Sequence, residues 1–145
     1  MNTNKPTTHG VRPWRTRLAL TAMMAWGLAQ TPCWAQHLNS PQAPCRTAGA
    51  DPEMTACFDH AYRNGDLRLN QLYQQIQAVL EPADRQRLET AERAWLKFRD
   101  AACDAEYDLY DGGSGGPLAY AACREEETRL RVGDLQTTYD WRLNK

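Results

Sequence analysis

The segment Gly112–Gly116, with the sequence GGSGG, has some of the residue types of a phosphate-binding loop. Such a loop needs a Lys and a Ser or Thr at fixed places after the glycines, and it connects a strand to a helix. Pro117 and Leu118 follow here instead, and no strand pattern precedes the glycines. The spacing therefore argues against phosphate binding. It favours a turn between two helices, in which Gly adopts the positive φ angles that end a helix and Ser114 supplies a hydroxyl.

Carboxylates cluster immediately before this turn, at Asp100, Asp104, Glu106, Asp108 and Asp111, with no basic residue among them. Acids four residues apart, such as Asp104 and Asp108, have a spacing compatible with acid–base catalysis, but this spacing is also ordinary on an exposed helix. The alternation of acids lacks the spacing of an EF-hand calcium loop. Two interpretations stay open: a solvated helix face, or a negative surface that attracts a basic partner.

Cysteine and histidine offer little for catalysis or metal binding. Four cysteines follow the N-terminal segment, at positions 45, 57, 103 and 123, and an even count in a small exported domain predicts two disulfides. No CxxC pair occurs, and only His37 and His60 lie in the same part of the chain, which is too few ligands for a zinc site. We therefore expect no catalytic centre, no cofactor and no bound metal.

Residues 1–35 have the pattern of a signal peptide. Four basic residues and no acid precede the apolar run Leu18–Ala29, which is 12 residues long and too short for a membrane span. Ala35 suits the position before a cleavage site, so we expect cleavage after it. A lipid anchor on Cys33 is the competing interpretation. The remaining protein would be periplasmic or secreted, with no membrane insertion.

Cleavage would change the charge of the chain. The formal net charge of −1 becomes −5, because the removed segment contains four of the basic residues and none of the acids. This excess of acid argues against nucleic acid and anionic membranes as partners and is compatible with a cationic protein. The sequence gives no prediction of the oligomeric state.

Apolar residues recur at intervals of three and four along most of the remaining chain. The spacing predicts an irregular arm over residues 36–50 and helices over 52–80, 82–110 and 117–139, with a short tail over 141–145. Pro52, Pro82 and Pro117 each suit the first turn of a helix. We predict an all-α, up-down-up bundle of three long helices, forming a helical domain over residues 51–140.

The bundle geometry places Cys57, Cys103 and Cys123 at one level, at the end that carries GGSGG. We predict the pairs Cys57–Cys103 and Cys45–Cys123, although Cys103–Cys123 is equally reachable by spacing. Trp95 and Phe98 lie on the apolar stripe and are expected in the core. We also predict an interhelical network that fixes the helix register, comprising the pairs Arg99–Glu53 and Asp100–Arg129.

Several motifs resemble one known family. They are Glu53-Met54 with Cys57, LNQLY at residues 69–73, AERAWLKFRDAAC at residues 91–103, the Gly-Gly-Ser element, and Cys123 with Thr128-Arg129. Together they resemble the lysozyme inhibitor LprI-like N-terminal domain family, over about residues 45–135. The chain departs from the family where Asp51-Pro52 replaces a frequent Thr-Gln. The resemblance implies an exported, helical, disulfide-bonded protein, and lysozyme inhibition as its function.

We combine this resemblance with the charge pattern in one hypothesis. The acidic end, with Asp104, Asp108 and Asp111, would attract a cationic lysozyme. The turn, with Gly112, Gly113 and Ser114, would enter the lysozyme cleft, and the Ser114 hydroxyl would bind a carboxylate there. The alternative is an interaction or structural protein of the cell envelope whose partner is not a lysozyme.

Overall fold

The computed structural model describes residues 37–145. The expected signal peptide, its cleavage after Ala35 and the lipid-anchor alternative at Cys33 lie outside these residues. The described part contains a short 3-10 helix, η1 (His37–Asn39), and three long helices, α1 (Asp51–Val79), α2 (Pro82–Asp108) and α3 (Gly115–Leu143). No strand occurs within residues 37–145. The predicted all-α class is confirmed, and α3 continues past the predicted end at Tyr139.

The helices begin and end where the local sequence requires it. Pro52 occupies the first turn of α1, and Asp51 and Glu53 there favour the positive end of the helix dipole. Ala50, and not Asp51, holds the cap position, without a side-chain hydrogen bond. Leu80 and Glu81 are extended, and Pro82 then starts α2, as expected for a residue that precedes proline.

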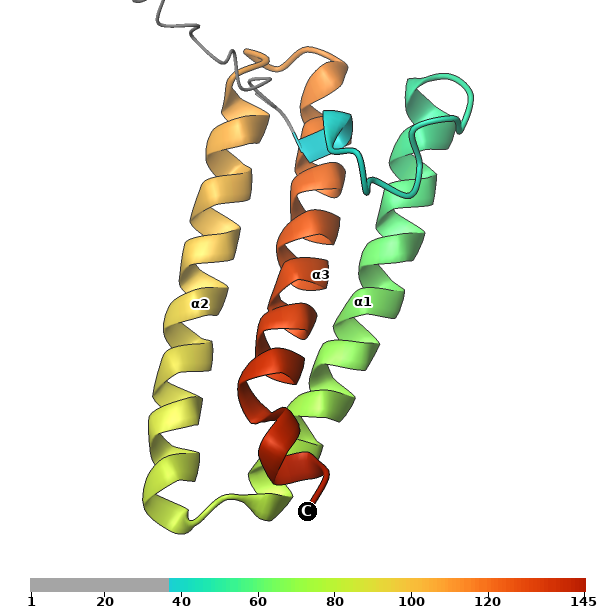
Figure 1. Cartoon of the computed structure of the whole chain (residues 1–145). Coiled ribbons are helices and arrows are strands. Elements are labelled where there is room, and N and C mark those ends of the chain that lie inside the picture. Colours follow the sequence, from blue (N-terminus) through green and yellow to red (C-terminus); the bar gives the residue numbers. More distant parts are fainter. Residues whose placement is uncertain (1–36) are drawn as a thin grey trace, which may run out of the picture. The chain divides into compact units, whose positions relative to one another are not determined.

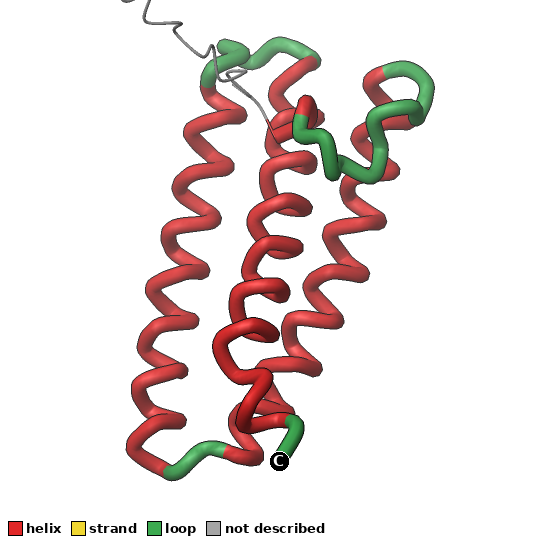
Figure 2. The backbone as a smooth tube through the Cα atoms, viewed as in Figure 1, coloured by secondary structure: helices red, strands yellow, loops and turns green. Residues whose placement is uncertain are grey.

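The three helices alternate in direction along the bundle (Figure 1), as in the predicted up-down-up arrangement. The arm, the start of α1 and the turn between α2 and α3 lie at one end, which we call the loop end, and the α1–α2 connection lies at the other (Figure 2). α3 packs against both α1 and α2, whereas α1 and α2 make at most a marginal contact with each other. α3 is therefore the most buried helix, although its apolar pattern is the weakest.

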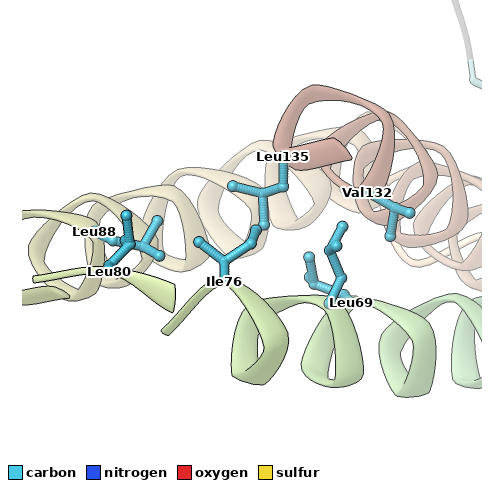
Figure 3. Close-up of a cluster of buried hydrophobic side chains, with 7 residues drawn as sticks. Leu69, Ile76, Leu80, Leu88, Val132 and Leu135 are labelled. Atoms are coloured by element: carbon cyan, nitrogen blue, oxygen red, sulfur yellow. The ribbon is translucent and has the colours of Figure 1, made fainter. Parts of the chain in front are cut away.

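The core consists of two apolar clusters. The first lies toward the α1–α2 connection and joins three residues of α1, together with Leu80 just after it, to Leu88 of α2 and to Val132 and Leu135 of α3 (Figure 3). The second lies at the loop end and contains Cys45, Phe58, Leu118, Ala121 and Ala122. Between these clusters α3 buries Glu125 and Thr128, which are polar. Gly65 lies against Thr128, and α1 continues through Gly65 without interruption.

The disulfides join Cys45 to Cys57 and Cys103 to Cys123. The predicted pairs Cys57–Cys103 and Cys45–Cys123 are therefore wrong. Cys57 lies on α1 and Cys103 lies on α2, and these two helices make at most a marginal contact with each other. The arm instead folds back on α1, which brings Cys45 to Cys57. Among the described residues, no helix combines the length and the apolar character needed to cross a bilayer.

Candidate functional site

The segment Gly112–Gly116, which we call the glycine turn, lies at the loop end and connects α2 to α3. Asp111 and Gly112 have φ angles of 48° and 79°, so the chain reverses through the left-handed region. The backbone N–H of Gly113 donates to the carbonyl oxygen of Tyr110 at 2.7 Å. Nothing lies within 4 Å of a Cβ built on Gly112, so this residue faces open space.

Two glycines of the turn are required by neighbouring tyrosines. A Cβ on Gly115 would clash with the ring of Tyr110. A Cβ on Gly116 would lie 3.2 Å from the ring of Tyr107, closer than most real contacts. Tyr107 also makes an edge-to-face contact with Tyr120 of α3. The glycine turn is therefore packed against α2 on one side and exposed on the other.

Ser114 occupies the cap position of α3 and is exposed. Its side chain makes no capping hydrogen bond, so its hydroxyl can meet a group outside the molecule. Ser114 lines a shallow hollow of about 830 Å³, together with residues of the α1 start and Pro117. This hollow brings the beginnings of α1 and α3 to the same surface.

The acidic residues of the loop end fall into two sets. Asp104, Asp108 and Asp111 are exposed, as are Asp51 and Glu53 at the start of α1. The second set is partly or fully buried and engaged within the protein: Glu106, Glu125, Glu126 and Glu127. Only the first set is available to a partner in solution. The negative surface is therefore smaller than the number of acidic residues in the sequence suggests.

The arm is attached to this second set. His37 pairs with Glu106 of α2 through Nδ1, and its Nε2 lies 3.6 Å from Glu127 of α3. The hydroxyl of Ser40, which is buried, donates to Glu126 at 2.9 Å. The hydrogen bond with Glu106 raises the pKa of His37, and the charges of the three glutamates raise it further, against the opposing effect of burial. His37 therefore joins the arm to two helices.

Two other features of this region concern proton and metal chemistry. Burial raises the pKa of Glu125, although the charge and hydrogen bond of Arg129 lower it. His37, Glu106 and Cys123 come close enough to share an ion. The sulfur of Cys123 is bonded to Cys103 and so cannot act as a thiolate ligand.

The predicted network has different partners in the structure. Arg99 donates from Nε and Nη2 to Asp100, at 2.9 and 2.8 Å, and its Nη1 lies 3.9 Å from Asp66 of α1. Arg129 pairs with Glu125 at 3.1 Å and lies 3.4 Å from Glu126. The pairs Arg99–Glu53 and Asp100–Arg129 are therefore wrong. Glu53 lies in the first turn of α1, whereas the residue of α1 at the level of Arg99 is Asp66.

Sequence reasoning missed a set of arginines stacked on aromatic rings. Arg99 is only 5% exposed and lies over Trp95 and Tyr62, with 5.2 and 5.7 Å to the ring centroids. Arg124 of α3 lies over Tyr62 at 3.9 Å. Phe98, predicted in the core, is instead 58% exposed. One feature of the sequence did indicate that Arg99 is buried. It lies four residues from both Trp95 and Cys103, and residues four apart share one face of a helix.

One protein family matches the helical part of the chain. The family model described as lysozyme inhibitor LprI matches residues 43–135. An uncharacterised protein of Rhizobium meliloti (strain 1021) is 29% identical over 113 residues, which cover 69% of this chain and 81% of the relative. No solved structure matches the chain.

Proposed function

The chain belongs to the LprI family of lysozyme inhibitors, and we propose that it is an exported binding protein, without catalytic activity, that inhibits a lysozyme. The observation that carries this proposal is the family match, which includes both disulfides and the glycine turn. The disulfides indicate an oxidising compartment, and the expected signal peptide supports the periplasm or the cell exterior.

Attraction of the enzyme is assigned to the exposed carboxylates of the loop end. Lysozymes are generally cationic, and exposed charge of one sign accelerates the encounter with a partner of opposite sign. Asp104, Asp108 and Asp111 are exposed around the glycine turn. Because such steering is screened within about 10 Å at 0.1 M salt, the association rate should fall as salt is added.

Inhibition is assigned to the glycine turn. Its outer side is narrow, since Gly112 and Gly113 have no side chains, and Ser114 presents its hydroxyl there. The packing of Tyr110 and Tyr107 against Gly115 and Gly116 holds the turn in one conformation, which lowers the entropy lost on binding. In the proposed complex the Ser114 hydroxyl donates a hydrogen bond to a carboxylate in the lysozyme cleft.

The test is lysis of peptidoglycan by lysozyme in the presence of the oxidised mature protein, at low and moderate salt. We expect inhibition that weakens with salt and that is abolished by Ser114→Trp. Thr137→Trp is the matched control, because Thr137 is also exposed on α3 but lies far from the turn, and it should inhibit as the wild type does. Equal inhibition by both variants would remove the glycine turn from the mechanism. No inhibition by the wild type at any salt would favour an envelope protein with a different partner.

A further inference from the structure

A pocket lies between α1 and α2, away from the glycine turn. These helices lie on either side of α3 (Figure 1) and make few contacts with each other. The pocket has a volume of about 260 Å³. Small-molecule sites occupy roughly 300–1,000 Å³, so this pocket has room for about one ring.

The apolar and aromatic lining of the pocket comes from both helices. Leu69 and Tyr73 contribute from α1, and Trp95 and Leu96 contribute from α2. The indole of Trp95 is held from within by Arg99 and Arg131, whose guanidinium carbons lie 5.2 and 5.7 Å from the ring centroid. These contacts fix the orientation of the ring, so the aromatic wall is formed before any ligand arrives.

The carboxylates of the polar rim are already engaged within the protein. Each of its three carboxylates has a partner: Asp66 accepts from Asn70 at 3.2 Å, Glu92 accepts from Arg131 at 3.0 Å, and Glu89 pairs with Arg93. An ionic ligand would have to displace one of these partners, which has a cost in desolvated charge. The rim therefore favours an uncharged ligand.

Groups that can hydrogen-bond such a ligand remain beside the aromatic wall. The hydroxyl of Tyr73 accepts from the Gln77 amide at 2.6 Å, which leaves its own proton to donate. Burial, and then the charges of Glu89 and Glu92, raise the pKa of Tyr73, so this proton is retained. Asn70 donates its N–H to Asp66, which leaves its carbonyl oxygen as an acceptor.

From this combination we infer that the pocket between α1 and α2 binds a saccharide ring. A pyranose is uncharged, it has an apolar C–H face that packs on an aromatic wall, and its hydroxyls both donate and accept along its edge. This inference does not depend on lysozyme inhibition.

The experiment follows the two indole N–H resonances of Trp95 and Trp141 by NMR while sugar is added to the oxidised mature protein. Trp141 is 57% exposed on α3, outside the pocket, and is the internal control. The probes are N-acetylglucosamine trimer and maltotriose, which distinguish an N-acetylated glycan from a plain one, and lysine amide as a cationic competitor. We expect Trp95 to shift with at least one sugar and Trp141 to stay unchanged.

Two tyrosine variants locate the binding. Tyr73→Phe removes the donor but keeps the ring, and it should weaken sugar affinity about threefold to tenfold, the effect of one hydrogen bond. Tyr139→Phe is the matched control, because Tyr139 packs against the same apolar cluster but does not line the pocket, and its affinity should equal that of the wild type. The inference is overturned if neither sugar shifts Trp95, if lysine amide alone shifts it, or if both variants lose affinity equally.

Discussion

Removal of the Cys103–Cys123 disulfide should destabilise the protein strongly. The bridge closes a loop with a sequence separation of 20 residues, and the entropy of closing such a loop in the unfolded chain corresponds to about 3 kcal/mol. Both cysteines are fully buried, so replacing them with Ala adds a small cavity cost of about 1 kcal/mol. We therefore expect Cys103→Ala/Cys123→Ala to lose about 3–4 kcal/mol of the free energy of unfolding.

The assay is urea unfolding of the oxidised protein, monitored by circular dichroism, with the melting temperature as a second measurement. A loss of this size should lower the melting temperature by roughly 10–20 °C in a domain of this length. The matched variant Cys45→Ala/Cys57→Ala opens a loop with a sequence separation of 12, and it should lose about 0.5 kcal/mol less in entropy. A loss below about 1 kcal/mol for the first variant would refute the loop-closure argument. A peptide map that links Cys57 to Cys103 would refute the packing of the helices.

Three further predictions concern single side chains. His37→Gln should lower stability at acidic pH. Because the folded pKa of His37 lies above its ordinary value of 6.5, the stability difference between variant and wild type should be full below about pH 6.5 and decline as the pH rises through the folded pKa. Urea unfolding across pH measures this difference, with His60→Gln as the control. A stability difference that grows with pH would contradict the pairing of His37 with the glutamates. Arg99→Met should cost about 1–2 kcal/mol, since it removes the hydrogen bonds to the half-exposed Asp100 and the stacking on Trp95 and on Tyr62 of α1. An unchanged melting temperature would show that these contacts do not stabilise the fold. Gly115→Ala should cost about 1–3 kcal/mol of the free energy of unfolding, because its Cβ meets the ring of Tyr110. Adding Tyr110→Ala to the same chain should recover part of this loss. If the two losses are additive in the double-mutant cycle, the contact between these residues is refuted.

The helices were predictable because their signals are local. Proline in the first turns of α1 and α2, together with three-four spacing of apolar residues, fixed their limits to within a few residues. The partners of side chains depend instead on which helices touch. Phe98 lies on the apolar stripe, but α2 has α3 as its main neighbour, so its buried face is narrow and Phe98 lies outside it. The same absence of α1–α2 packing decided the disulfide pairing.

The residues of the candidate site were predictable from the sequence. Which of its carboxylates are engaged within the protein was not. The glycine turn and the exposed Asp104, Asp108 and Asp111 lie together at the loop end, as the order of the helices required. The sequence could not show that Glu106 and Glu127 are engaged by His37, because that contact depends on the path of the arm. The arginine stacking around Trp95 also depends on contacts between α2 and α3.

The disulfide arrangement has a topological consequence. One bridge lies within the arm and α1, and the other lies within the α2–α3 hairpin, so within residues 37–145 only the peptide backbone near Leu80–Pro82 connects these two pieces covalently. A protease cut at that connection would yield two fragments that non-covalent packing alone holds together. Two separately produced chains that meet at this connection would have only non-covalent contacts between them, so their association would depend on concentration.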